Sequence, residues 1–270
     1  MYRLGCCVPG GSFMPQGVGS VETAYDIMKS GYDTAKANGY DFAEATVGLV
    51  MKLTEAELEL AVKNKLRFEV CNSFIPPVLP ICETMKNDSG KLERYVDEAM
   101  RRMTLLGSKI VIFGSGAARR IPDSMNRAAC EALLDEFIIL CNKYAEKHGM
   151  IVALEPLNTG ETNYMTSVAD GYGIVRKLNL PNIRLLADAY HMSKENEPLD
   201  ILSVVSPVLV HVHVSEPDRS YPGKTGGEYL KKFADALRQT SYNARVSVEC
   251  TYTDFPADAG EAFKFMEATF

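Results

Sequence analysis

Eight short apolar segments, each followed by a longer segment of helical character, constrain the fold of this chain more than any other feature. The segments that we predict as strands are Leu4–Val8, Phe42–Val47, Leu66–Asn72, Lys109–Gly114, Ile151–Glu155, Ile183–Asp188, Val208–Val214 and Arg245–Thr251. Strands that alternate with helices pair in parallel through right-handed crossovers. Eight such units in 270 residues predict one (β/α)8 barrel domain over residues 1–270, because about 250 residues is typical of that fold.

Apolar residues recur at helical spacing in three of the intervening segments. The stripes are Val96, Ala99, Met100, Met103 and Leu106 in the first, Leu133, Phe137, Leu140 and Tyr144 in the second, and Leu230, Phe233, Ala234 and Leu237 in the third. Gly39, Gly107 and Gly149 each lie between a helical pattern and a strand. A helix end favours a residue that tolerates positive φ, so these glycines predict helix C-termini.

An open, doubly wound sheet is the alternative architecture. Such a sheet usually carries a glycine-rich phosphate turn of the form G-x-G-x-x-G after its first strand. Here the segment Val8–Ser12 reads Val-Pro-Gly-Gly-Ser, which does not match that turn. No composition shift marks a linker, and the chain is therefore predicted to be a single-domain α/β barrel.

Charge and composition exclude several classes of partner. The 29 basic residues are outnumbered by 35 acidic ones, which gives a net charge of −6, and this argues against nucleic acid or an anionic membrane as a partner. The apolar runs are far shorter than the roughly 20 residues of a membrane helix. The seven cysteines include no C-x-x-C pair, and the first residues lack the apolar region of a signal peptide. We therefore expect reduced thiols in a cytoplasmic protein.

Four consecutive predicted strands end in a carboxylate or an imidazole. These residues are Glu155, Asp188, His213 and Glu249, each preceded by mostly apolar residues. Active sites of (β/α)8 barrels lie at the C-terminal ends of the strands, and neighbouring strands are about 4.8 Å apart. A single acidic residue at a strand end is commonly a cap, but four in succession predict one site. Buried carboxylates this close repel each other unless a cation compensates them.

Three carboxylates and one imidazole form a mostly oxygen ligand set, which favours Mn²⁺, with Mg²⁺ or Co²⁺ as alternatives, over a thiol-rich zinc site. His211 and His213 are two residues apart and so face the same side of their strand. His213 is nearer the barrel mouth and is the predicted ligand, whereas His211 is predicted to be a hydrogen-bonded residue one layer deeper. Cys250 follows Glu249 directly and points to the opposite face.

The four predicted ligands resemble the metal ligands of the xylose isomerase-like TIM barrels, in particular those of the ketose 3-epimerases. In those epimerases a Glu lies six residues after the first ligand, a His three after the second, and an Arg six after the ligand His. Glu161, His191 and Arg219 occupy these positions here, and the resemblance implies that they bind the substrate. The chain departs from the family's usual Gly-Glu-x-Asn-Arg run, because it reads Ser-Glu-Pro-Asp-Arg over 215–219, and it contains no Trp.

The resemblance implies a metal-dependent sugar isomerase or epimerase of the ketose 3-epimerase kind, and a homo-oligomer such as a dimer or a tetramer. Its chemistry is removal of a proton from the carbon next to a carbonyl, through an enediolate that one divalent ion stabilises. Glu155 and Glu249 are the predicted acid/base pair. Asp188 and His213 are predicted to act as ligands only.

Other sites are weaker predictions. Glu44 either reaches the substrate or caps a loop, and the segment Phe113–Arg120, with two glycines and two arginines, is either an anion site or a solvated loop. His148 is predicted to interact with a helix C-terminus. A further group of residues either forms walls of the pocket or packs within the loops: Phe13, Phe74, Tyr252, Met14, Met51 and Met192.

Three other functions compete with the sugar isomerase or epimerase. A lyase of the inosose dehydratase type would use the same site to expel a hydroxyl group after proton abstraction. A phosphodiesterase or repair nuclease on this barrel assembles several metal ions and needs more than the four histidines present. A non-catalytic binding protein would have to keep several buried charges without using them.

Overall fold

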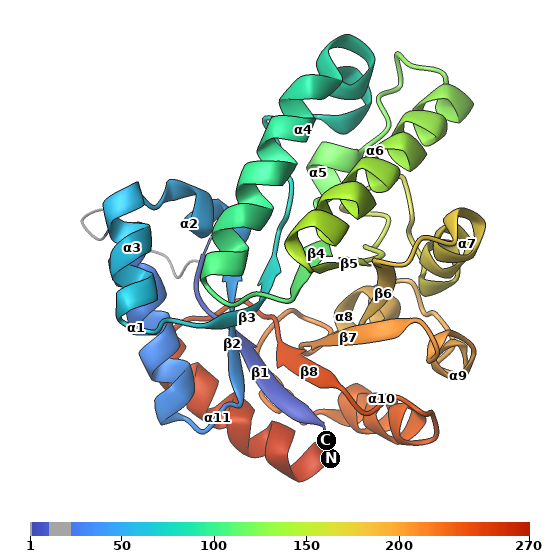
Figure 1. Cartoon of the computed structure of the whole chain (residues 1–270). Helices are drawn as coiled ribbons and strands as arrows, with labels where there is room; N and C mark the ends of the chain where they lie inside the picture. The colour runs from blue at the N-terminus through green and yellow to red at the C-terminus, as the bar shows by residue number, and fades with distance from the viewer. Residues whose placement is uncertain (1, 11–22) are drawn as a thin grey trace.

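The computed structural model describes residues 2–10 and 23–270, and in it eight parallel strands close into one barrel in the order of the sequence (Figure 1). The strands are β1 Arg3–Cys7, β2 Phe42–Thr46, β3 Phe68–Asn72, β4 Ile110–Phe113, β5 Ile151–Leu154, β6 Ile183–Asp188, β7 Leu209–Val214 and β8 Arg245–Val248. All eight predicted strands are present, and β1 pairs with β8 to close the barrel. The predicted (β/α)8 fold is therefore confirmed.

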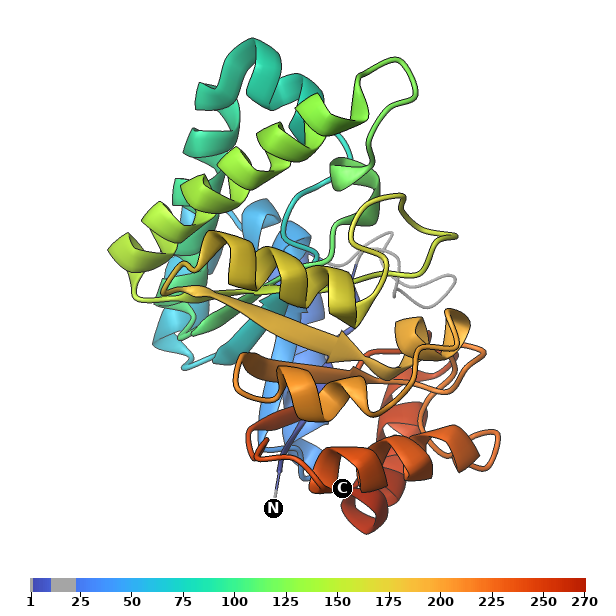
Figure 2. The ribbon, with the colours of Figure 1, turned by 90° about the vertical axis from the view of Figure 1, so that its right-hand side faces the viewer.

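Helices fill the connections between the strands on the outside of the barrel (Figures 1 and 2). They are α1 Ala24–Ala37, α2 Val47–Lys52, α3 Glu55–Lys63, α4 Ile81–Leu105, α5 Gly116–Arg119, α6 Arg127–His148, α7 Val168–Leu178, α8 Ala189–Lys194, α9 Ile201–Val205, α10 Glu228–Arg238 and α11 Phe255–Thr269. Polar residues cap the N-termini of several helices. Reciprocal capping boxes begin α1, α3 and α7, with Thr23, Thr54 and Ser167 as the capping residues. Gly149 ends α6 with a φ of 64°, as predicted.

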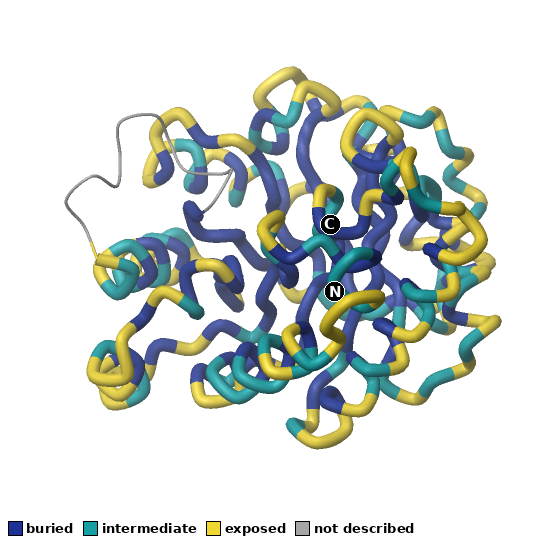
Figure 3. The backbone as a smooth tube through the Cα atoms, turned by 90° about the horizontal axis from the view of Figure 1, so that it is seen from above, coloured by how far each residue is buried: buried dark blue, intermediate teal, exposed yellow. Residues whose placement is uncertain are grey.

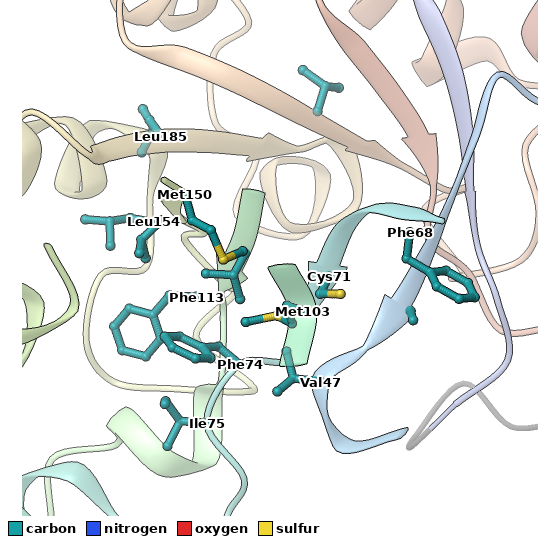
Figure 4. Packing of buried hydrophobic residues seen from close by; sticks show 14 of the residues in the cluster. Val47, Phe68, Cys71, Phe74, Ile75, Met103, Phe113, Met150, Leu154 and Leu185 are labelled. Atoms are coloured by element: carbon teal, nitrogen blue, oxygen red, sulfur yellow. The ribbon is translucent and has the colours of Figure 1, made fainter. Parts of the chain in front are cut away.

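The hydrophobic core lies between the barrel and its helices, as the buried inner parts of the chain in Figure 3 indicate. Phe74, Met103 and Phe113 belong to this packed cluster (Figure 4), and the Phe113 ring meets that of Phe137 on α6 at 5.4 Å. Each such side chain contributes roughly 1.5–3 kcal/mol when fully buried. A second, smaller cluster fills the barrel interior and consists of Phe42, Val70, Ile110, Ile112, Ala153 and Leu186.

The long helices α4 and α6 pack side by side (Figures 1 and 2). The buried face of α6 includes Leu134, Ile138 and Cys141, whereas the predicted stripe had placed Leu133 and Leu140 there. Both of these residues are only partly buried, so the helix was predicted correctly but its buried face is rotated. Among the described residues, no helix combines the length and the apolar character needed to cross a membrane.

Candidate metal centre and its pocket

The barrel architecture brings the four predicted ligands together at the C-terminal ends of β5 to β8. Asp188 is the last residue of β6 and His213 lies near the end of β7, while Glu155 and Glu249 each follow directly after a strand. One donor atom from each residue lies within 4.8 Å of those from the other three, and all four residues are buried. The fold thus gathers four ionisable residues into one compact group, although the first and the last, Glu155 and Glu249, are 94 positions apart in the sequence.

His213 lies between the two glutamates of this group. Its Nδ1 atom is 3.1 Å from Glu155 Oε1 and 3.6 Å from Glu249 Oε1. Burial lowers the pKa of His213, but the charges of Glu249 and Glu44 outweigh burial, so the pKa lies well above its ordinary value. Burial, reinforced by the nearby charge of Glu155 and only partly opposed by His213, raises the pKa of Glu249 to about 8.

Arg219 joins the other two carboxylates. Its Nη1 atom donates to Asp188 Oδ2 at 2.9 Å, and its Nη2 atom donates to Glu249 Oε2 at 2.6 Å. Burial raises the pKa of Asp188, but the charges of Arg219 and His191 outweigh burial and hold it below its ordinary value. The guanidinium also lies 4.3 Å from the ring centre of Tyr190, a cation–π contact that fixes its plane. Arg219 adopts a φ of 67°, which is uncommon for a residue with a side chain.

The donor set fits a hard divalent cation. Ligands on adjacent corners of an octahedral Mg²⁺ or Mn²⁺ site are roughly 3 Å apart, given metal–oxygen distances of about 2.1 Å. The 3.1 and 3.6 Å separations of His213 Nδ1 from the glutamate oxygens are close to that value. The raised pKa of Glu249 also indicates that its buried carboxylate lacks sufficient positive charge nearby. Glu155, Asp188, His213 and Glu249 could therefore hold one such ion.

The other nitrogen of His213 faces a second buried carboxylate, Glu44 of β2. His213 Nε2 is 3.2 Å from Glu44 Oε2, and His211 Nε2 is 2.7 Å from Glu44 Oε1. Burial alone would raise the pKa of Glu44, but the charges of both histidines bring it well below its ordinary value. A carboxylate that holds one imidazole nitrogen leaves the other free to bind a metal ion, and it fixes the orientation of the ring.

This arrangement corrects one prediction and confirms another. Glu44 neither lines the pocket nor caps a loop, because it is fully buried beneath His213. The capping role next to it belongs to Thr46, whose Oγ1 accepts from the Leu49 amide. His211 is the hydrogen-bonded residue one layer deeper that the sequence predicted. Cys7 completes this buried group, and its Sγ lies 3.5 Å from Glu44 Oε2.

The three residues implied by the resemblance to bind substrate also lie beside the four candidate ligands, Glu155, Asp188, His213 and Glu249. His191, Glu161 and Arg219 all line the pocket. His191 Nδ1 accepts from the backbone N–H of Asn158 at 3.1 Å, so the ring proton is on Nε2. This Nε2 atom lies 3.6 Å from Asp188 Oδ2. Asn158 also donates to Glu161 Oε1 at 3.0 Å. Asn158 therefore orients both side chains, and the sequence analysis did not identify it.

Asn72 is a second residue that the sequence analysis missed. It is the last residue of β3 and is buried. Its Nδ2 atom donates to Glu249 Oε1 at 3.2 Å and lies 3.2 Å from Cys7 Sγ. Its position at a strand end is a usable signal, although an amide is a less specific sign of a site than a carboxylate or an imidazole. Asn72 and Arg219 thus each donate to a different carboxylate oxygen of Glu249, Asn72 to Oε1 and Arg219 to Oε2, and together they restrain this side chain.

The group of candidate ligands opens into a pocket of about 440 Å³. Its described lining residues are Thr46, Gly48, Leu49, Lys52, Ser73, Ile75, Pro76, Pro77, Tyr95, Ser115, Gly116, Ala117, Ala118, Glu155, Leu157, Glu161, His191, Arg219 and Glu249. Phe74, Met192 and Tyr252 pack in the core, and Met51 packs against it. Of the two alternatives for these residues, packing therefore holds and a pocket wall does not. Phe13 and Met14 lie outside the described residues.

Neither alternative for the segment after β4, an anion site or a solvated loop, holds at Arg119. This side chain is fully buried, and its guanidinium donates to the carbonyl oxygens of Phe113, Glu155 and Met165. Burial lowers the pKa of Arg119 to about 10. Its donors therefore stabilise the loops after β4 and β5. His148 lies in the last turn of α6, as predicted, but its Nε2 is also 2.7 Å from Asp97 Oδ1 on α4.

A family model described as "xylose isomerase-like TIM barrel" matches residues 32–269. The chain belongs to this family. The resemblance seen in the sequence is thus confirmed at the level of the family.

Curated relatives include an L-ribulose 3-epimerase from Methylomonas sp., which is 32% identical over 135 residues, 50% of this chain and 44% of the relative. A D-psicose 3-epimerase from Agrobacterium fabrum is 29% identical over 107 residues, 39% of this chain and 37% of the relative. A 3-dehydro-D-guloside 4-epimerase from Escherichia coli is 26% identical over 118 residues, 43% of this chain and 45% of the relative. The matches therefore span less than half the length of these relatives.

Solved structures align over the whole barrel. A D-allulose 3-epimerase from Methylomonas sp., in complex with D-allulose, has a TM-score of 0.81 and 20% identity, covering 100% of this chain and 97% of that one. An AP endonuclease of family 2 from Brucella melitensis has a TM-score of 0.73 and 19% identity, covering 100% of both chains. At these identities the likeness shows the fold. Since the fold supports different chemistries, the function must be argued from the site.

Proposed function

We propose that this protein is a divalent-metal-dependent sugar epimerase or isomerase, acting by proton transfer at the carbon next to a carbonyl. The observation that supports this most directly is the pair of buried glutamates, Glu155 and Glu249, on either side of His213 Nδ1. Both also line the pocket and so have access to a bound molecule. The names of the relatives, which are epimerases of ketoses and of a keto-glycoside, agree with this chemistry.

Glu155, Asp188, His213 and Glu249 are the proposed ligands of one ion, which we propose to be Mn²⁺, with Mg²⁺ or Co²⁺ as alternatives. When bound, such an ion supplies positive charge for the enediolate oxygens and fixes the geometry of the substrate. The residues of this chain that then move the proton are Glu155 and Glu249. One carboxylate takes the proton from one face of the sugar and the other returns a proton to the opposite face, a role worth about 10²- to 10⁴-fold in rate for each.

Three further residues are proposed to hold the substrate. The N–H of His191 Nε2 and the guanidinium of Arg219 would donate to the substrate oxygens at the reacting end. Both groups line the pocket beside Asp188. Glu161, oriented by Asn158, accepts from a hydroxyl group. We further propose that the protein assembles into a dimer or tetramer. The seven buried, unpaired cysteines support our proposal that it works in the reducing cytoplasm.

The experiment is proton exchange from a panel of ketoses and inososes in heavy water, after metal analysis of the purified protein. We expect deuterium to enter the carbon next to the carbonyl, and Glu155→Gln and Glu249→Gln each to lower this rate by at least about 100-fold. Glu131→Gln, on the outer helix α6, is the matched control. Wild-type exchange in either pocket variant would remove the acid/base assignment. Loss of water with a new ultraviolet absorbance would indicate the dehydratase instead.

A further inference from the structure

A second group of possible metal ligands lies beneath the four candidate ligands at the barrel mouth, and it contains a sulfur atom. Cys7 of β1, Glu44 of β2 and His213 of β7 each contribute one donor atom, and these three atoms lie within 4.8 Å of one another. All three residues are at most 1% exposed. This set is here called the sulfur group. His213 belongs to both groups, through Nδ1 at the barrel mouth and through Nε2 in the sulfur group.

The distances within the sulfur group fit a tetrahedral zinc ion. Typical Zn–S, Zn–N and Zn–O distances are about 2.3, 2.0 and 2.1 Å, which places neighbouring ligand atoms of a tetrahedron roughly 3.4 to 3.6 Å apart. The structure places Glu44 Oε2 3.5 Å from Cys7 Sγ and 3.2 Å from His213 Nε2. An ion among these atoms would therefore require only small movements of the side chains.

The surrounding side chains hold these ligands and offer a further one. His211 Nε2 lies 2.7 Å from Glu44 Oε1, which leaves Oε2 for an ion and fixes the carboxylate. Asn72 Nδ2 is 3.2 Å from Cys7 Sγ, whereas the buried Asn72 Oδ1 finds no hydrogen-bond partner among the described residues. A buried acceptor without a partner is destabilising. Rotation of this amide would give up its hydrogen bond to Glu249 and present Oδ1 to an ion as the fourth ligand.

The sulfur atom gives this group a different metal preference from the ligands at the barrel mouth. Thiolate and imidazole ligands favour Zn²⁺, whereas carboxylate oxygens favour Mg²⁺ and Mn²⁺. Burial, together with the charge of Glu44, raises the pKa of the Cys7 thiol well above its ordinary value, so the free thiol keeps its proton. A zinc ion displaces that proton to solvent, because a thiol that coordinates zinc is deprotonated.

The two groups compete for His213. A neutral imidazole has one unprotonated ring nitrogen, so an ion held by Nε2 leaves Nδ1 protonated and unable to bind another ion at the barrel mouth. We propose that Cys7, Glu44 and His213 form a zinc site, and that zinc bound there inhibits the protein by withdrawing His213 from the ligands of the other ion. The inhibition rests on the proposed metal-dependent function, whereas the zinc site does not.

The zinc site is tested by identifying the atoms around the bound metal. The protein is produced in cells supplied with Zn²⁺ or Co²⁺, so that the ion can enter this buried group while the chain folds. X-ray absorption of the zinc form should show one sulfur atom at about 2.3 Å from the metal. The cobalt form should show a thiolate-to-cobalt charge-transfer band in the near ultraviolet. A metal surrounded by nitrogen and oxygen atoms alone, or a protein that takes up no zinc, would overturn the inference.

Two neighbouring cysteines provide a matched pair of variants. Cys6 is as buried as Cys7, but its Sγ lies 3.2 Å from the Tyr252 hydroxyl and it belongs to neither ligand group. Cys7→Ala should remove the metal–sulfur signal and lower zinc affinity at least about 100-fold, because the loss of a ligand exceeds the loss of its supporting partner. Cys6→Ala should keep the signal and the affinity. A metal–sulfur signal that persists in Cys7→Ala would overturn the inference.

The inhibition is measured as the effect of zinc on Mn²⁺ binding and on deuterium exchange from the substrate. Zinc in the sulfur group should weaken Mn²⁺ binding at least about tenfold, both in the parent protein and in Cys6→Ala. Zinc can also compete directly for the ligands at the barrel mouth, so Cys7→Ala decides between the two sites. Zinc should be at least about tenfold less inhibitory in Cys7→Ala. Equal inhibition in the two variants would overturn the proposed inhibition.

The outcomes also distinguish this inference from the proposed function. If no ketose or inosose exchanges a proton but zinc binds through sulfur, the proposed function fails and the zinc site stands. If proton exchange occurs in the manganese-loaded protein but bound zinc has no sulfur ligand, this inference fails and the proposed function stands.

Discussion

The two sides of the barrel mouth differ in how their residues are held. On the side that follows β5 to β8, here called the β5–β8 side, the side chains hold one another, as Arg219 bridges Asp188 and Glu249 while His213 lies between the two glutamates. On the side that follows β2 to β4, here called the β2–β4 side, the polar side chains bond to backbone groups instead. Thr46 caps its own loop, whereas Ser115 and Tyr95 reach across to the backbone of the loop after β3. Changes on the β5–β8 side should therefore spread through the whole charged group. Changes on the β2–β4 side should remain local and alter the shape of the pocket.

The largest effect is expected from the loss of a ligand on the β5–β8 side. His213→Gln should lower the affinity for Mn²⁺ by more than the roughly 10- to 100-fold typical of changes outside the ligand shell. The protein should then lose the rise in melting temperature that saturating metal gives to a chain that binds it only when folded. Titration calorimetry and thermal melts with and without Mn²⁺ measure both effects. His148→Gln, on α6, is the control, and wild-type affinity in His213→Gln would exclude this site.

A smaller loss should follow from the residue beneath His213. Glu44→Gln keeps the shape of the side chain but removes the charge that faces His213 Nε2 at 3.2 Å. We expect Mn²⁺ affinity to fall about 10- to 100-fold, as is typical when the partner of a ligand imidazole is lost. Calorimetry measures this loss, and the near-ultraviolet spectrum reports whether the core is retained. An unchanged affinity would mean that Glu44 does not orient His213.

Metal affinity should also depend on pH. The pKa of Glu249 is raised from 4.5 to about 8 in the metal-free protein, so this carboxyl retains its proton through neutral pH. A metal ion must displace that proton and also the proton of His213, whose pKa burial alone would lower but the charges of Glu249 and Glu44 raise well above its ordinary value. Affinity should therefore rise with pH by between about tenfold and about a hundredfold per unit until these ligands have lost their protons. Calorimetry in a series of buffers measures this slope. An affinity that stays constant as the pH approaches 8 from below would contradict the assignment of Glu249 as a ligand.

The smallest effect is expected on the β2–β4 side. Thr46→Val removes the side-chain cap at the start of α2 and should lower the free energy of unfolding by about 1 kcal/mol. Mn²⁺ affinity should not change, because the β5–β8 side makes no use of this cap. Thr54→Val removes the cap of α3 outside the pocket and serves as the matched control in denaturant titrations. A loss of metal affinity in Thr46→Val alone would show that the two sides are coupled.

The features predicted correctly from the sequence are those that depend on neighbouring residues in the chain, such as the strands and their last residues. Strand ends are local features, so the rule that barrel strands present their last residues at one mouth found Glu155, Asp188, His213 and Glu249 and predicted their proximity. Glu44 was interpreted incorrectly because it lies within β2, at a point where the β2–β3 register shifts between Ala43 and Glu44. Its position beneath His213 depends on how strands from opposite parts of the barrel face each other, which no local pattern contains.

Arg119 illustrates a second limit of the sequence. Glycines and arginines after a strand are equally compatible with a loop that binds an anion and with a loop tied to the protein itself. The choice depends on which carbonyl oxygens lie nearby, and these come from Glu155 and Met165 as well as from Phe113. Only tertiary structure brings those three groups together.

Arg119 has a consequence for exchanging loops between members of this family. Its guanidinium donates to the main-chain oxygen of Glu155 at 2.7 Å. Arg119, which follows β4, therefore helps to position the backbone of Glu155, the proposed acid/base residue that follows β5. The β4–α5 segment could be replaced with that of a relative to change substrate selectivity. The replacement would then need an arginine that makes the same hydrogen bond to Glu155. Without it, Glu155 would begin from a shifted backbone, and altered selectivity would come together with slower turnover.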